Sequence, residues 1–105
     1  MLDMQKHLQE KINKDKFGEI VYNQEYINFM SLALIAEICE ALRETPFRYW
    51  KIQQKLDKEK FQEELIDCWH FFMNLLIAAN INEDILYEMY CKKNKINFGR
   101  QEDKY

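Results

Sequence analysis

The sequence predicts an all-α protein, a compact bundle of four to five helices. Only two glycines and one proline interrupt its 105 residues, so long helices are expected and sheets are not. Two segments of helical length, 29–42 and 65–79, are almost wholly apolar. A helix that is apolar on most sides is a buried helix, so both segments are expected to be covered. The length fits a single domain, 1–105.

The first two helices have recognisable ends. Apolar residues at helical spacing fill 1–12, and this helix is expected to end near Asp15, with Gly18 beyond it where a C-cap glycine commonly lies. A second helix is expected over 24–44. It stops before Pro46, because the residue that precedes a proline disfavours the α conformation.

The third helix follows a connection over 45–56 that carries aromatic and basic residues in alternation. Asp57 is a suitable N-cap for this helix, because its carboxylate can accept a hydrogen bond from a backbone N–H of the first turn. The helix is expected to run to about Ala79, where the sequence Asn-Ile-Asn interrupts the apolar run.

A fourth helix is expected to start after an Asn82 cap and to end near Lys95. Acidic residues follow the cap directly, and negative charge stabilises a helix N-terminus. The tail over 96–105 is polar and contains Gly99. Such a segment is expected to become ordered only when ligand binds.

Charge and cysteine content narrow the class of protein. A net charge of -3 argues against a nucleic-acid backbone as the main partner. The cysteines have no C-x-x-C or zinc-binding spacing, so reduced thiols, mostly in the core, are expected at Cys39, Cys68 and Cys91. The sequence shows no secretory leader and no apolar run of about 20 residues that could cross a bilayer. A cytoplasmic protein without a membrane partner is expected.

The apolar content predicts contact with a second copy of the chain. Hydrophobic residues make up 48% of the sequence and aromatic residues 14%, which is rich for so short a chain. A bundle of this size cannot cover two helices that are apolar on most sides. A homodimer is therefore expected, with part of this surface buried between the subunits.

Two pairs of acids stand out against this apolar background. Glu37 and Glu40 are the only charges in 29–42, and Glu64 and Asp67 mark the start of the second apolar run. A spacing of three residues places each pair on one helix face. Because ionised carboxylates are costly to desolvate and repel one another, a divalent cation is the usual compensation. Oxygen ligands favour Mg²⁺ or Mn²⁺.

Two ordinary interpretations compete with a metal site. The acids could lie on solvated faces and pair with lysines, which is the preferred interpretation for Glu44, Glu59 and Glu63 because their surroundings are polar. His70 follows Asp67 at i+3 on the same face. A lone histidine on an apolar helix is more often a hydrogen-bonded core residue than a ligand.

The E-x-x-E and E-x-x-D motifs resemble those of the all-α nucleoside triphosphate pyrophosphatases, the MazG-like superfamily. The segment 31–50 and the segment 92–105, which reads KKNKINFGRQEDKY, resemble the dimeric dUTPase branch of that superfamily. The resemblance implies a helical homodimer that uses Mg²⁺, with Mn²⁺ as a substitute, to cleave dUTP to dUMP and pyrophosphate. It also leaves room for dUDP as a substrate.

The resemblance also implies roles for individual residues. The metals would be held by Glu37, Glu40, Glu64 and Asp67, and Glu37 or Glu40 would position the attacking water. The phosphates would face Lys93, Arg100 and Tyr105, and the deoxyribose or phosphates would face Asn94 and Asn97. These residue types suit the chemistry, because an arginine fork matches phosphate oxygens and an amide both donates and accepts hydrogen bonds.

The base pocket of the family uses polar side chains of the first helix and aromatic packing. Gln5 matches the family's glutamine, and Gln9 lies where relatives have asparagine or aspartate. A glutamine amide can pair with an acceptor and a donor on the uracil edge, which would separate uracil from cytosine. Trp50 and Phe71 are candidate apolar walls, and His70 is a further candidate for the pocket; each aromatic could equally be a core residue.

The sequence is compatible with two other functions. The chain could be a MazG-like pyrophosphatase for another nucleotide, such as dCTP or a modified nucleotide, because the acids do not read the base. It could also be a non-catalytic helical binding module that keeps the scaffold. Stabilisation by Mg²⁺ would favour an enzyme over a binding module, since a ligand that binds only the native state raises the melting temperature.

Overall fold

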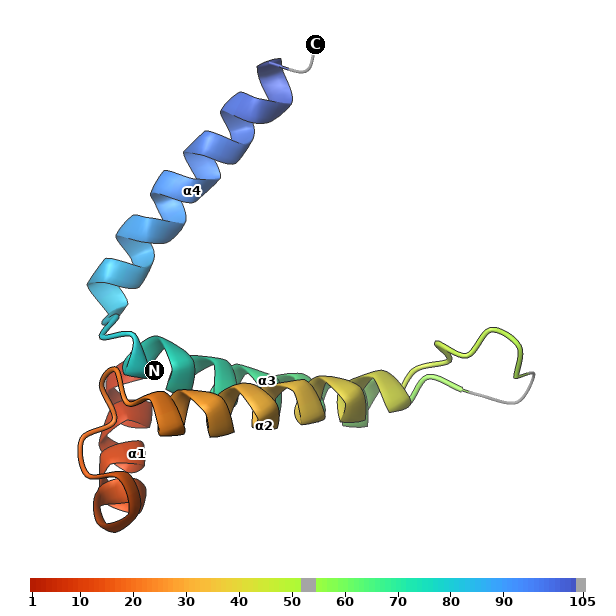
Figure 1. The fold of residues 1–105 in the computed structure, drawn as a ribbon. Coiled ribbons are helices and arrows are strands. Elements are labelled where there is room, and N and C mark those ends of the chain that lie inside the picture. The colour runs from red at the N-terminus through yellow and green to blue at the C-terminus, as the bar shows by residue number, and fades with distance from the viewer. Residues whose placement is uncertain (52–54, 104–105) are drawn as a thin grey trace.

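The computed structural model describes residues 1–51 and 55–103 and consists of helices joined by loops (Figure 1). The described residues contain no strand, so the predicted all-α class is confirmed. The four helices are α1 (Leu2–Phe17), α2 (Gln24–Arg43), α3 (Lys58–Ala78) and α4 (Glu83–Asp103). None of these described helices is long and apolar enough to cross a membrane.

Three helix caps form where the sequence predicts them. Gly18 ends α1 with a φ of 66°, a left-handed conformation that glycine adopts without steric cost, and its N–H donates to the Lys14 carbonyl. Asp57 caps α3 by accepting a hydrogen bond from the Lys60 backbone N–H at 3.1 Å. Asn82 accepts one from the Ile85 N–H at 2.8 Å, ahead of α4.

Helices α2 and α3 lie side by side and run antiparallel, and α1 packs at the end of this pair that is remote from the connecting loop (Figure 1). The small core lies at this junction. It consists of Leu2, Ile20, Tyr26, Met73, Ile77 and Ala78. A backbone hydrogen bond of 2.6 Å from the Tyr22 N–H to the Ala78 carbonyl ties the α1–α2 loop to the end of α3.

Helix α4 departs from the sequence prediction in its length and its direction. It continues to Asp103 and does not end near Lys95, so the segment 96–103 belongs to this helix. Gly99 does not stop it, because a glycine inside a helix costs only about 1 kcal/mol. The helix projects away from the other three (Figure 1). Its start is held by Glu83, which accepts a hydrogen bond from the Leu2 backbone N–H at 2.8 Å.

A single chain leaves much of its apolar surface uncovered. Its accessible area is 8668 Å², whereas about 6300 Å² is expected for a folded monomer of this mass. Its radius of gyration is 17.5 Å, whereas a globular chain of this length has about 13 Å. Within α2 only Tyr26 and Ala41 are buried among the described residues, so the apolar helices are not covered by their own chain. Cys39 and Cys91 are exposed as well, and the expectation that most cysteines lie in the core is wrong for the single chain.

Candidate active site

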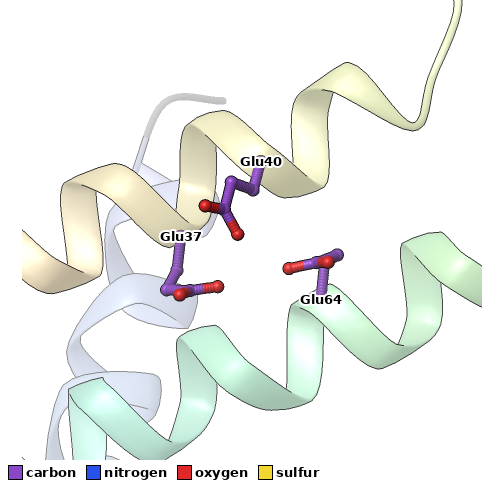
Figure 2. Close-up of side chains that lie close together, drawn as sticks. All are labelled: Glu37, Glu40 and Glu64. Carbon is purple, nitrogen blue, oxygen red and sulfur yellow. The ribbon is translucent and has the colours of Figure 1, made fainter.

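Three of the four predicted acids converge between α2 and α3. Glu37 and Glu40 extend from α2 toward Glu64 on α3 (Figure 2). One carboxylate oxygen from each residue lies within 4.8 Å of those from the other two. The convergence follows from the sequence, because each E-x-x-(E/D) pair lies on one helix face and the antiparallel packing turns the two faces toward each other.

The donor atoms of this cluster fit a hard divalent cation. The Oε2 atoms of Glu37 and Glu64 are buried and have no hydrogen-bond partner among the described residues. An unpaired buried carboxylate oxygen is strongly unfavourable, and a cation bound at these two neighbouring positions would offset that cost. An all-oxygen donor set matches Mg²⁺ or Mn²⁺. The structure therefore supports Glu37, Glu40 and Glu64 as candidate ligands.

The cluster is electrostatically strained in the absence of a cation. Burial raises the pKa of Glu37 above its usual value, and the negative charge of Glu40 raises it further, followed by that of Asp67. The charge of Asp67 is therefore close enough to act on the pKa of Glu37. Asp67 itself lies outside the group of Glu37, Glu40 and Glu64, whose oxygens lie within 4.8 Å of one another. Burial raises the pKa of Cys68 as well, and the negative charges of Glu37, Asp67 and Glu64 raise it further, which keeps its thiol protonated and poorly nucleophilic.

The raised pKa of Glu37 predicts a pH-dependent stability. The folded state binds the Glu37 proton more tightly than the unfolded state, so folding stability falls as pH rises from the ordinary glutamate pKa through the raised value. The variant E37Q has an amide in place of this carboxyl group, so it does not titrate at this position. In EDTA, we expect it to melt above the wild type at pH 7, and this difference should vanish below about pH 4. Thermal melts of both proteins from pH 3.5 to 8 measure it, and a difference independent of pH would contradict the assignment.

A second pocket adjoins the carboxylates through Asp67. It has a volume of about 280 Å³ and lies between α1 and α3. Its lining brings together five of the residues predicted from sequence, with two others, in the set Gln5, Leu8, Gln9, Asp67, His70, Phe71 and Asn74. Asp67 therefore links this pocket to the acidic cluster, because it lines the pocket and its charge also acts on Glu37.

Other candidate residues are not part of this arrangement in one chain. Trp50, predicted as a wall of the base pocket, is 64% exposed and packs edge to face on Tyr49 in the loop after α2, at the opposite end of the α2–α3 pair from α1 (Figure 1). The candidate phosphate-binding residues on α4 are exposed on the projecting helix: Lys93, Asn94, Asn97 and Arg100. Tyr105 lies outside the described residues.

Sequence reasoning missed the residues that hold the two glutamines. Asn74, which is only 2% exposed, is the partner of Gln5. Tyr26, which is fully buried, donates its hydroxyl hydrogen to Gln9. A signal for Asn74 was present, because it is a lone amide in an apolar run, seven residues after Asp67 and so on the same helix face.

Comparison with known proteins identifies the family. A family model described as dUTPase matches residues 1–85. The chain belongs to this dUTPase family. The resemblance seen in the acidic motifs is thereby confirmed, while the segment 92–105 lies beyond the matched region.

Two phage proteins are similar to this dUTPase family member. The dCTP pyrophosphatase of Enterobacteria phage LZ5 is 31% identical over 138 residues, a match that covers the whole of this chain and 80% of the phage protein. The dCTP pyrophosphatase of Enterobacteria phage T4 is 32% identical over 65 residues, which is 55% of this chain and 38% of that protein. No solved structure matches the chain.

Proposed function

We propose that this protein is a Mg²⁺-dependent nucleoside triphosphate pyrophosphohydrolase that cleaves a pyrimidine deoxynucleoside triphosphate to its monophosphate and pyrophosphate. The observation that carries the proposal is the cluster of Glu37, Glu40 and Glu64, with its two unpartnered buried oxygens. Membership of the dUTPase family and the phage pyrophosphatases support the same reaction class. Mn²⁺ is expected to replace Mg²⁺, because both accept all-oxygen ligands.

The reaction is a hydrolysis at phosphorus. The oxygen of a water molecule bonds to a phosphorus atom of the triphosphate, and the anhydride P–O bond to the departing pyrophosphate breaks. Bound Mg²⁺ would supply the positive charge that offsets the phosphate oxygens and lowers the pKa of a bound water. Glu37 or Glu40 orients the attacking water and takes its proton, because both carboxylates belong to the cluster that would hold the cation. Glu64 and Asp67 complete the acidic wall that holds the cation.

The base of the substrate is the finer part of the proposal. Family membership favours dUTP, and dUDP with it, whereas both phage relatives are dCTP pyrophosphatases. We place dCTP first because the similarity to the LZ5 protein extends over the entire chain. In either case the base occupies the pocket between α1 and α3, where Phe71 offers an apolar contact and Gln5 and Gln9 offer hydrogen bonds.

We also propose that the protein works as a homodimer. The exposed apolar side chains of α2 and α3 include Phe29, Leu32, Ile35, Ile38, Leu65, Ile66 and Phe72. An apolar cavity of about 630 Å³ remains open between α3 and the start of α4. A second copy would cover these surfaces. Because α4 projects away from the α2–α3 pair of its own chain (Figure 1), we expect its phosphate-binding candidates to serve the partner's site.

The test of the proposal is pyrophosphate release from dCTP, dUTP, dTTP, UTP and dATP, together with phosphate release from dUDP, each measured with Mg²⁺ and with EDTA. We expect rapid release from dCTP or dUTP in Mg²⁺, loss of release in EDTA, and little release from the ribonucleotide. Release from dATP alone would contradict the pyrimidine assignment. No release from any nucleotide, together with no effect of Mg²⁺ on the melting temperature, would favour the helical binding module instead.

A further inference from the structure

The side-chain amide of Gln5 is held in one orientation by a chain of contacts that starts at a methionine. The Asn74 Nδ2 lies 3.3 Å from the Met30 sulfur, and the Gln5 Nε2 lies 2.8 Å from the Asn74 Oδ1. A thioether sulfur can accept a hydrogen bond but has no hydrogen to donate. Rotating the Asn74 amide by half a turn would therefore place its oxygen against another acceptor. The sulfur thus fixes Asn74, and Asn74 fixes Gln5 with its Oε1 left for another partner.

The side-chain amide of Gln9 is held the other way round, with its oxygen engaged and its nitrogen available. The Asn13 Nδ2 donates both to the Gln9 backbone carbonyl and to the Gln9 Oε1, each at 2.9 Å. The backbone carbonyl can only accept, so it fixes the nitrogen of the Asn13 amide at this position. The Tyr26 hydroxyl donates to the same Gln9 Oε1 at 2.8 Å. Since that oxygen already receives two hydrogen bonds, Gln9 offers its Nε2, a donor, to any ligand.

The pocket between α1 and α3 thus presents an acceptor from Gln5 and a donor from Gln9. Gln5 is the deeper of the two, at 9% exposed, while Gln9 is half-buried. A base that enters with its sugar toward solvent and the acidic cluster brings its C4 substituent to the deepest position. In cytosine that substituent is an amino group, a donor, and the neighbouring N3 is an acceptor. In uracil the two are reversed, an oxygen at C4 beside an N3–H.

We propose that Asn74 is a positioning residue that sets base choice. Asn74 holds the Gln5 Oε1 at a position where this oxygen accepts a hydrogen bond from the cytosine amino group and repels the uracil oxygen. Asn74 thereby makes the site selective for cytosine nucleotides. This inference rests on the proposed pyrophosphohydrolase function and names its substrate. It reverses the expectation that a glutamine amide would separate uracil from cytosine by pairing with the uracil edge, because the Gln5 amide is held in one orientation.

The test compares kcat/KM for dCTP and dUTP in the wild type and in two variants. The wild type is expected to favour dCTP by about 100-fold, since a fixed acceptor opposite a carbonyl oxygen leaves buried polar groups unpaired. In N74A the Gln5 amide can rotate, so the ratio of kcat/KM for dCTP to kcat/KM for dUTP should fall at least tenfold. This fall should come from a higher KM for dCTP and a lower KM for dUTP. M30L preserves the volume and removes only the sulfur acceptor, and it should lower the ratio several-fold even if N74A fails to fold. M4L is the matched control at a side chain that is 79% exposed, and it should leave the ratio unchanged.

Binding of dCMP and dUMP, measured by calorimetry in EDTA, separates this inference from the proposed function. A preference for dCMP that N74A and M30L reduce supports the role of Asn74, whether or not the protein cleaves triphosphates. Cleavage of dCTP and dUTP with a ratio that neither variant changes would overturn the inference and leave the proposed function standing. A wild-type preference for dUTP and dUMP would overturn it as well.

Discussion

E37Q is expected to lower kcat by about 1000-fold or more on the best nucleotide while all four helices stay folded. Glu37 carries one of the two unpartnered buried oxygens and feels the negative charge of every other acid in the cluster. Glutamine keeps the size of the side chain but removes the charge that would bind a cation and accept a proton from water. It also relieves repulsion among the acids, so the variant without metal should be at least as stable as the wild type.

Two measurements separate loss of chemistry from loss of structure. Mg²⁺ should raise the melting temperature of the wild type by about 10 °C or more at saturation, because it binds the native state alone, and it should have little effect on E37Q. E63Q is the matched control, since Glu63 precedes Glu64 on α3 and is exposed to solvent. We expect it to retain wild-type turnover and the full response to Mg²⁺. Normal turnover by E37Q would refute the assignment of the acidic cluster as the active site.

Local signals in the sequence were enough to predict the helices and the acidic cluster. The caps at Gly18, Asp57 and Asn82 act within one helical turn, so no knowledge of tertiary structure is needed to recognise them. The meeting of Glu37 with Glu64 needed one tertiary assumption, the antiparallel packing of two apolar helices. Two such helices that follow each other in the chain cover much of their apolar surface when they pack antiparallel, which makes that packing the simplest arrangement.

The features that depend on packing between distant segments could not be predicted in the same way. The sequence predicts an end of α4 near Lys95, which is too early, because a polar segment with Gly99 has weak helix signals. Helix propagation past one glycine nevertheless costs little. The role of Trp50 was assigned from its residue type, and the structure places it in the loop after α2, away from Gln5. The orientations of the Gln5 and Gln9 side-chain amides depend on hydrogen-bond donors and acceptors from three helices, which no local sequence pattern encodes.

The direction of α4 leads to the second large expected effect, which concerns how two subunits share a site. Lys93 and Arg100 are exposed on a helix that points away from the carboxylates of its own chain. If they bind the phosphates, the double variant K93A/R100A should lose about 1000-fold in kcat/KM, because two charge-assisted contacts to the substrate disappear. The single variant K95A, on the same helix, is the control and should keep wild-type turnover.

Mixing two inactive variants then tells which subunit's site α4 serves. E37Q has intact α4 residues, and K93A/R100A has intact carboxylates. If α4 reaches the partner's site, each mixed dimer holds one complete site and one with both lesions, and an equal mixture should recover about a quarter of wild-type activity, since half of randomly formed dimers are mixed. If α4 folds back on its own chain, every site carries a lesion and the mixture stays inactive. Recovered activity requires both a dimer and a site built from two chains, so this single result tests the homodimer together with the projecting helix.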